Sequence, residues 1–163
     1  VIDLGTGSGA IALALQAARP DLQMHAIDAS QDALAVARAN GERLGLPVRF
    51  AHGNWLEGAG SGYGLIVSNP PYIRADDPHL PALRHEPLSA LAAGADGLDD
   101  IRRIVQAAPD HLADAGWLLL EHGHDQAADV RALLAARGFE QVQSRRDIAG
   151  IERCSGGLWR AVK

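Results

Sequence analysis

The sequence predicts an α/β fold: a Rossmann-like sheet that is mostly parallel and ends in an antiparallel pair at its C-terminal edge. Two observations predict this class. Apolar, strand-like runs alternate with stretches of helical periodicity, and the connections between them are short through most of the chain. A glycine-rich turn also follows directly after the first apolar run, residues 1–4. Both patterns are typical of strands that lie parallel with helices on the faces of the sheet.

The elements of the first half follow from local chemistry. Alanine and leucine content predicts a helix over residues 10–18, which stops before Arg19-Pro20. Ser30 is a good N-cap for the next helix. Apolar positions of that helix recur at three- and four-residue spacing, namely Leu34, Ala37, Gly41 and Leu44. The predicted strands of this half span residues 1–4, 22–28, 47–51 and 64–68.

Regular periodicity stops in the middle of the chain. Residues 73–98 carry Pro78, Pro81 and Pro87 among scattered charges, and so long a connection within a domain is typical of a lid or binding loop. We therefore expect a substrate-side loop there. The remaining predicted elements are a helix over residues 99–112, a strand over 116–121, a helix over 125–137 that Gly138 ends, and an antiparallel edge pair over 139–147 and 157–163.

Length and composition limit the function classes. With 163 residues, 47% of them hydrophobic, the whole chain 1–163 fits one domain. A net charge of -5 argues against a broad nucleic-acid footprint and favours a protein or small-molecule substrate. The lone Cys154 gives no disulfide framework, and no membrane span or signal peptide is evident, so we expect a cytoplasmic protein without membrane association. Because the glycine turn comes so early, we also expect a preceding segment to be missing.

The glycine-rich turn is a candidate cofactor site. Glycines without a Cβ let backbone N–H groups approach a ligand closely between a strand and a helix. The spacing of Gly5, Gly7 and Ala10 also fits the looser dinucleotide pattern, so the turn alone suits either a nicotinamide cofactor or S-adenosylmethionine. Asp3 favours the second, because a carboxylate attracts an ammonium group and repels a pyrophosphate. A purely structural turn is the alternative. The candidate residues are Asp3, Gly5, Thr6, Gly7, Ser8 and Gly9.

Polar residues follow three further predicted strands. Asp28 can accept both hydroxyls of a ribose, or it can cap the next helix. Asn54 and Trp55 can contact the edge and the face of an adenine, although a loop tryptophan can also serve packing alone. Asn69 follows the fourth strand. Ligands of open α/β sheets bind beyond the carboxyl ends of the strands, so the agreement of these positions indicates one shared site.

The sequence Asn69-Pro70-Pro71-Tyr72 is the candidate substrate site. The two prolines fix their own φ and force Asn69 into an extended conformation, so its amide lies on a stiff backbone beside an aromatic ring. This arrangement suits a planar, hydrogen-bonding substrate; a proline-rich turn is the alternative. We expect catalytic roles for Asn69, Pro70 and Tyr72, with Pro71 in substrate binding. Residues 121–125 include two histidines but lack a second ligand cluster, so we predict no metal site.

These residues resemble the class I S-adenosylmethionine-dependent methyltransferases, and more closely the HemK/PrmC family, which methylates the side-chain amide of a glutamine in peptide chain release factors. The tetrad at Asn69 is shared with nucleic-acid amino methyltransferases, so the closer resemblance depends on flanking segments. Segments that match in order are residues 3–13, Asp28, Trp55, residues 67–73, 77–79, 86–88 and 120–123.

The resemblance implies S-adenosylmethionine as cofactor, with S-adenosylhomocysteine as product, and release factors as partners. It assigns cofactor binding to residues 5–9, Asp28 and Trp55, and glutamine binding to residues 69–72. Asn54 stands where the family often has an aspartate, and the family's N-terminal helical domain is absent from the chain. The competing hypotheses are a nucleic-acid adenine methyltransferase, a cofactor-binding fragment without activity and, weakest, a nicotinamide-dependent reductase.

Overall fold

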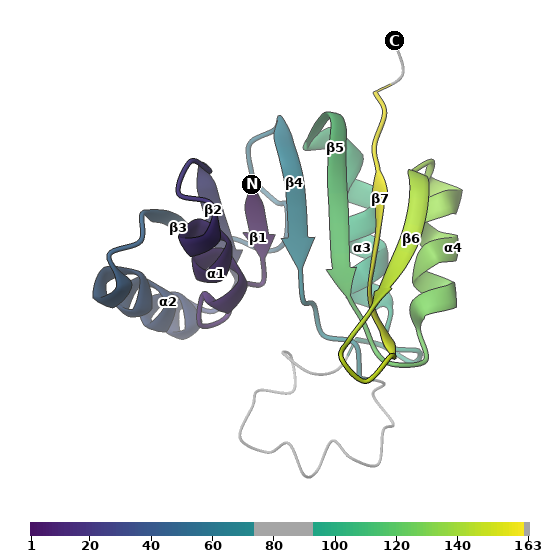
Figure 1. Cartoon of the computed structure of the whole chain (residues 1–163), viewed down its shortest axis with the longest axis horizontal. Coiled ribbons are helices and arrows are strands. Elements are labelled where there is room, and N and C mark those ends of the chain that lie inside the picture. The colour runs from purple at the N-terminus through teal and green to yellow at the C-terminus, as the bar shows by residue number, and fades with distance from the viewer. Residues whose placement is uncertain (74–92, 162–163) are drawn as a thin grey trace.

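The fold of the chain is a seven-stranded sheet with helices on both faces (Figure 1). The computed structural model describes residues 1–73 and 93–161. The strand order is β3-β2-β1-β4-β5-β7-β6; β1 to β5 pair in parallel, and β7 pairs antiparallel with β5 and β6. The predicted fold class is therefore confirmed. The strands are β1 (Ile2–Leu4), β2 (Met24–Asp28), β3 (Val48–His52), β4 (Tyr63–Ser68), β5 (Leu112–Glu121), β6 (Glu140–Arg146) and β7 (Glu152–Leu158).

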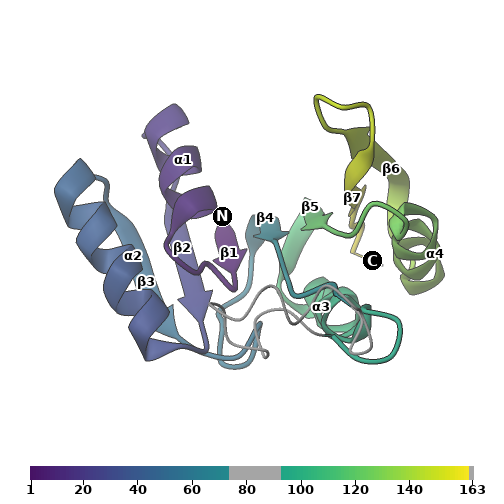
Figure 2. The ribbon, with the colours of Figure 1, turned by 90° about the horizontal axis from the view of Figure 1, so that it is seen from below.

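The helices divide between the two faces of the sheet. Figure 2 shows α1 and α2 on one face, over the β3-β2-β1 half, and α3 and α4 on the opposite face. Within the described ranges, no helix is long and apolar enough to span a membrane. The helices are α1 (Ala10–Ala18), α2 (Gln31–Leu44), α3 (Asp99–Ala107), the short 3-10 helix η3 (Ala108–Asp110) and α4 (Ala127–Arg137).

Most helix boundaries lie where local signals in the sequence predict them. Helix α1 has the predicted bounds, and the Ser30 hydroxyl accepts a hydrogen bond from the Ala33 N–H at 3.2 Å, as expected of an N-cap. Gly138 ends α4 in a left-handed conformation at φ 101°. Of the four periodic positions, Leu34, Ala37 and Gly41 are buried, whereas the Leu44 side chain is 51% exposed. Helix α2 packs on the outermost strand β3, so its last turn has no further strand to cover it.

The helix predicted over residues 99–112 ends earlier than expected. Pro109 has no N–H to continue the α-helical hydrogen bonds, so α3 stops at Ala107 and η3 follows. Strand β5 then begins at Leu112, four positions before the predicted start at Gly116. The substrate-side loop expected over residues 73–98 lies largely outside the described residues.

The second strand of the C-terminal pair lies earlier than residues 157–163, which corrects that prediction. Strand β7 begins at Glu152. Its small residues have low strand propensity, so the sequence did not indicate a strand there. A Cβ on Gly156 would collide with the Leu119 side chain and the Leu118 carbonyl, and one on Gly157 would come within 2.8 Å of Phe139 Cβ. The glycines are therefore needed where β7 inserts between β5 and β6.

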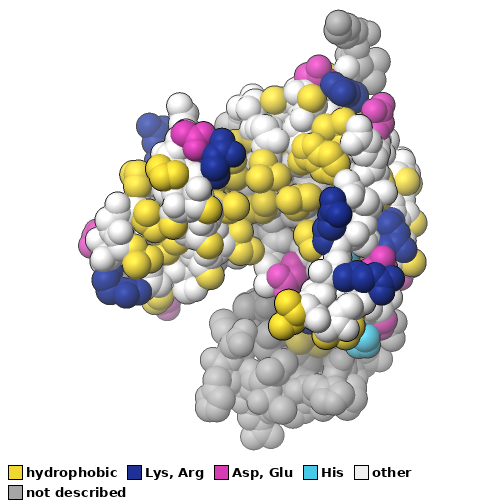
Figure 3. Space-filling model, viewed as in Figure 1, with side chains coloured by type: hydrophobic (Ala, Val, Ile, Leu, Met, Phe, Trp, Pro, Cys, Tyr) yellow, Lys and Arg dark blue, Asp and Glu magenta, His cyan; other side chains and the backbone are white. Residues whose placement is uncertain are grey.

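The main core lies between the sheet and helices α3 and α4. Its fully buried side chains include Ile66, Leu118 and Leu120 from the central strands. Alternation along those strands turns Leu65, Trp117 and Leu119 to the opposite face, where they are half-buried. Figure 3 shows hydrophobic side chains gathered over the middle of the sheet on that face. Both faces of the central strands are thus apolar, as expected of a parallel sheet.

Candidate functional site

The strand register brings the candidate residues to one edge of the sheet. Leu4 pairs with Ile27 on one side and with Ser68 on the other. The residues that follow, Gly5, Asp28 and Asn69, therefore form a row across three neighbouring strands. Since strands lie about 4.8 Å apart, Asp28 and Asn69 are on the order of 10 Å from each other. The expectation of one shared edge is confirmed, and the edge lies at the switch point between β1 and β4, where ligands bind in such sheets.

The glycine turn depends on left-handed backbone at three positions. Gly5, Gly7 and Gly9 have φ of 66°, 57° and 85°. A Cβ on Gly9 would come within 3.1 Å of Leu13 Cδ1 and 3.3 Å of Ala37 Cβ, so this glycine lets α1 and α2 lie close together. A Cβ on Gly7 would meet no atom of the described residues within 4 Å. Among those residues, none covers the outer side of the turn at Gly7.

Thr6 and Ser8 tie the same turn to its neighbours. The Thr6 N–H donates to the Ile27 carbonyl at 3.0 Å, which fixes the turn to β2. Ser8 is exposed, and its carbonyl accepts a hydrogen bond from Asn40 Nδ2 at 3.0 Å. The turn is thus held from α2 as well as from the sheet.

Asp3 is a buried carboxyl beneath the turn, only 1% exposed. Its Oδ2 accepts from Thr6 Oγ1 at 2.7 Å and from the Ala12 N–H at 3.2 Å, whereas its Oδ1 has no partner among the described residues. Burial raises the pKa of Asp3 to about 6; the two hydrogen bonds lower it in part, and the charge of Asp28 raises it. A cationic group would stabilise the ionised form of this carboxyl.

Asp28 joins the turn to the start of α2. Its Oδ2 accepts from the Gly7 N–H and its Oδ1 from the Ser30 N–H, both at 2.8 Å. The helix-capping alternative is therefore partly correct, although the N-cap itself is Ser30. Each carboxylate oxygen can accept a second hydrogen bond. The half-buried Asp28 keeps the capacity to bind a hydroxyl group while it holds the turn.

The Trp55 side chain packs against the glycine turn. A Cβ on Gly5 would come within 3.0 Å of the indole Cζ3, so only glycine lets the ring lie this close. The indole N–H donates to Asp100 Oδ1 of α3 at 3.2 Å. Trp55 has φ 51°, a left-handed conformation that is unusual for a bulky residue. Sequence reasoning missed Asp100, because no local pattern links it to a tryptophan 45 positions away.

Asn54 precedes this tryptophan and is exposed. Its backbone carbonyl accepts from the Glu57 N–H at 3.0 Å, which starts a turn, and its Nδ2 lies 3.5 Å from Glu57 Oε1. Asn54 and Trp55 help to line a hollow of about 550 Å³ between the β3–β4 connection and α3. Its other lining residues are Leu56, Glu57, Arg103, Ala107 and His111.

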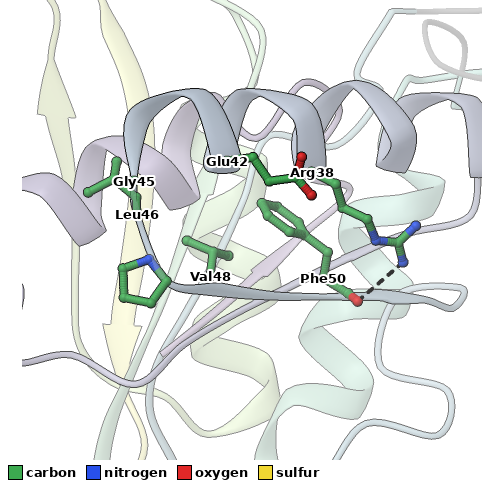
Figure 4. Close-up of a pocket in the computed structure, with 8 residues that line it drawn as sticks. Arg38, Glu42, Gly45, Leu46, Val48 and Phe50 are labelled. Atoms are coloured by element: carbon green, nitrogen blue, oxygen red, sulfur yellow. Dashed lines mark hydrogen bonds between the residues drawn. The ribbon is translucent and has the colours of Figure 1, made fainter.

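A second hollow, of about 400 Å³, lies away from this edge, between α2 and β3 (Figure 4). Arg38 donates to the Phe50 carbonyl across it at 3.3 Å. None of the candidate residues contributes to it. Its lining residues are Arg38, Gly41, Glu42, Gly45, Leu46, Pro47, Val48 and Phe50.

The segment 69–72 is anchored at both of its ends. Ser68 Oγ donates to the Leu4 carbonyl at 2.7 Å, which ties the end of β4 to β1. Asn69 is exposed, Pro70 is buried, and Pro71 and Tyr72 are half-buried. The Tyr72 carbonyl accepts from Gln126 Nε2 at 3.0 Å. The segment therefore leaves the sheet in a fixed direction with the Asn69 side chain at its surface.

Gln126 is a second residue that sequence reasoning missed. It is 6% exposed and precedes α4, and its contact with Tyr72 spans 54 positions. The stretch 121–125 before it fits the predicted strand end. Among the residues that the structure describes, no group of three His, Cys, Asp or Glu side chains could hold a metal ion. Residues 77–79 and 86–88, which carry part of the family resemblance, lie outside the described residues.

Comparison with known proteins finds relatives that are similar in sequence over nearly the whole chain. A release factor glutamine methyltransferase of Pseudomonas aeruginosa is 54% identical over 163 residues, with 98% of this chain and 59% of the relative covered. One of Bordetella pertussis is 51% identical over 161 residues, with 96% and 60% covered. The chain thus spans about three fifths of the length of these curated relatives. The expected resemblance to the glutamine methyltransferases of release factors is confirmed.

Solved structures with little sequence identity share the fold. A methyltransferase from Pyrococcus furiosus superposes with a TM-score of 0.75 at 20% identity, over 99% of this chain and 75% of that protein. The ribosomal protein L11 methylase of Lactobacillus delbrueckii gives a TM-score of 0.69 at 19% identity, over 99% and 69%. The family profile of the methyltransferase small domain matches residues 1–86, which is more than half of the 163 residues. The chain therefore belongs to the methyltransferase small domain family.

Proposed function

We propose that this chain transfers a methyl group from S-adenosylmethionine to the side-chain amide nitrogen of a glutamine in peptide chain release factors. The observation that carries the proposal is the position of the segment 69–72, one strand away from the glycine turn and anchored at both ends. Relatives about half identical over nearly the whole chain support the same substrate. We assign the activity to residues 1–163 as one domain, with residues 73–98 on the substrate side.

The residues of the edge fit this cofactor. The Oδ1 of Asp3, which has no hydrogen-bond partner among the described residues, suits contact with an ammonium group, and no described residue fills the space beside Gly7. Asp28 would accept from the ribose hydroxyls, and Trp55 with Asn54 would contact the adenine. The full set proposed to hold the cofactor is Asp3, Gly5, Thr6, Gly7, Ser8, Gly9, Asp28, Asn54, Trp55 and Asn69.

When bound, the cofactor supplies an electrophilic methyl group, so that a C–N bond to the substrate forms as a C–S bond breaks. An amide nitrogen is a poor nucleophile because its lone pair is delocalised, and the first task of the protein is therefore orientation. The Asn69 side-chain oxygen and the Pro70 carbonyl would each accept one N–H of the glutamine amide. These contacts fix the nitrogen and increase its electron density. Tyr72 would stack on the amide plane, and the proton would leave to solvent after transfer.

The test is incubation with S-adenosylmethionine carrying a labelled methyl group and separate pools of release factors, DNA and RNA. Label in the release factor pool, at a glutamine, is the expected result. Label in DNA or RNA would instead support the nucleic-acid adenine methyltransferase hypothesis. Cofactor binding without transfer to any pool would support a fragment without activity. Stabilisation by a nicotinamide cofactor but not by S-adenosylmethionine would support the reductase hypothesis.

The expected cytoplasmic location stays a prediction.

A further inference from the structure

A continuous path of hydrogen bonds joins the β6–β7 hairpin to the segment 69–72. It begins at Arg131 of α4, whose Nη1 donates to Ser144 Oγ at 2.6 Å. Ser144 Oγ lies 2.7 Å from Ser155 Oγ, and Ser155 Oγ lies 2.7 Å from His122 Nε2. His122 and Ser155 are both fully buried. The path therefore crosses from the edge of the sheet to the end of β5 with little access to water.

The two ends of this path set the direction of every hydrogen bond. A guanidinium only donates, and the Gly123 carbonyl, 2.9 Å from His122 Nδ1, only accepts. In the neutral imidazole the proton is therefore on Nδ1, and Nε2 accepts from the Ser155 hydroxyl. Ser155 in turn accepts from Ser144, which accepts from Arg131. A single arrangement satisfies each group.

Gly123 also contacts Gln126, through the N–H of the preceding peptide unit. The Gly123 N–H donates to Gln126 Oε1 at 2.7 Å, so the amide oxygen must face Gly123. The amide nitrogen then donates to the Tyr72 carbonyl at 3.0 Å and to the Asp96 carbonyl at 3.1 Å. Neither carbonyl can donate, so a flipped amide would lose all three contacts. A Cβ on Gly97 would come within 2.7 Å of the amide nitrogen, so glycine is required beside it.

We propose that Gln126 is a positioning residue for methyl transfer: its amide is oriented by the Gly123 N–H and holds the Tyr72 carbonyl, while the His122 ring, held by Ser155, contacts the carbonyl of the same glycine. The proposal rests on the proposed function. Pro70 and Pro71 have fixed φ, so fewer backbone dihedrals are free to absorb a shift of the Tyr72 carbonyl before it reaches Asn69. A misplacement of about 1 Å at a reacting group can lower a rate about 100-fold.

The kinetic test uses Gln126→Met, which keeps an unbranched side chain and removes the polar groups. Gln16→Met is the matched control, because Gln16 is 1% exposed in α1 and, among the described residues, its amide nitrogen donates only to the Pro20 carbonyl, at 3.3 Å. With a release factor as acceptor, Gln126→Met should lower kcat/KM at least tenfold and change the Kd for S-adenosylmethionine less than twofold, while the control changes neither. Equal losses in both quantities, or no loss of kcat/KM, would overturn the proposal.

A spectroscopic test separates this proposal from the proposed function. The chain has two tyrosines, so tyrosine labelled with ¹³C at the carbonyl gives one signal for Tyr63 and one for Tyr72. Gln126→Met should shift the Tyr72 signal and leave that of Tyr63 in place; Gln126→Glu, which keeps the acceptor for Gly123 and loses both donors, should do the same if the first variant does not fold. An unshifted Tyr72 signal refutes the positioning role even where transfer occurs. If the Tyr72 signal shifts but the protein labels no release factor, the result supports Gln126 as the anchor of the Tyr72 carbonyl and contradicts the proposed methyltransferase function.

Discussion

The two halves of the sheet build their polar sites in different ways. In the first half, β1 to β3 with α1 and α2, most contacts of the candidate carboxylates are with groups nearby in sequence: Asp3 contacts Thr6 and Ala12, and Asp28 contacts Ser30, whereas the contact of Asp28 with Gly7 spans 21 positions. In the second half, β4 to β7 with α3 and α4, the contact of Tyr72 with Gln126 spans 54 positions. Turn chemistry supplies most of the carboxylate contacts of the first site, whereas the contact of Tyr72 with Gln126 exists only after the strands are assembled.

Two carboxyl groups, one from each half, also differ in the direction of their pKa shifts. Burial under the glycine turn raises the pKa of Asp3 to about 6. In the second half, Arg102 donates to Asp96 and holds the pKa of that carboxyl at about 2. The first carboxyl is destabilised as an anion unless a cation binds it, and the second already has its cation. This difference is what the proposed cofactor site in the first half requires, whereas the contact at Asp96 is already complete.

The largest expected effect tests this division directly. Asn69→Ala removes the proposed acceptor for the substrate amide and should lower the methyl-transfer rate about 1000-fold, about 4 kcal/mol of transition-state stabilisation. The Kd for S-adenosylmethionine should change only a few-fold. Asn54→Ala, in the first half, should give the opposite pattern, with weaker cofactor binding and a nearly unchanged rate at saturation. Single-turnover kinetics and calorimetry measure the two quantities; comparable losses at Asn69 would make it chiefly structural.

Two glycines of the same turn should differ in their effect on stability. Gly9→Ala adds a Cβ in a left-handed conformation and within 3.1 Å of Leu13 Cδ1, so we expect a loss of about 3 kcal/mol in the free energy of unfolding. Gly7→Ala has the backbone strain without the collision, and about 1 kcal/mol is expected. Urea denaturation measures both. Equal losses would mean that the packing of α1 against α2 tolerates the added methyl group.

The pH dependence of stability should identify Asp3. Its folded pKa, about 6, lies above the ordinary 3.8, so the proton binds the folded state more tightly, and this stabilisation is present below about pH 4 and lost as pH rises through 6. Relative to Asp3→Asn, the wild-type free energy of unfolding should fall by about 2 kcal/mol between pH 4 and pH 7. The contributions of other titrating groups to the free energy of unfolding cancel in this difference. A flat difference across the range would show that Asp3 titrates normally.

The smallest expected effect concerns the buried hydroxyls of the second half. Ser155→Ala leaves His122 Nε2 without its donor in a fully buried position and should cost about 1 kcal/mol of stability. Ser144→Ala removes a half-buried hydroxyl that water can replace, so a smaller loss is expected. Urea denaturation of both variants measures the difference. A larger loss for Ser144→Ala would place the main stabilisation at the Arg131 end of the path.

The same contrast explains how far the sequence predicts the structure. The Ser30 cap, the end of α4 at Gly138 and the row of Gly5, Asp28 and Asn69 follow from local chemistry and from the parallel order of strands. Asp100 and Gln126 could not be predicted, because an aspartate in a helix and a glutamine before one have no local pattern that indicates a partner.

The prediction for β7 failed for a related reason. Its residues Ser155, Gly156 and Gly157 have low strand propensity, and only the close fit between β5 and β6 explains them. Local propensity describes a residue against its sequence neighbours, whereas this strand is determined by its neighbours in the sheet.

The strand order also has a consequence for folding during synthesis. Among the strands that the structure describes, β7 is made last, yet it lies between β5 and β6, which are both made earlier. Until Leu158 has emerged, β6 has no partner strand and His122 has no hydroxyl for its Nε2. A nascent chain halted before β7 already contains the residues that anchor the segment 69–72, but the place between β5 and β6 is unfilled. Insertion of β7 is therefore the step that joins β6 to the rest of the sheet.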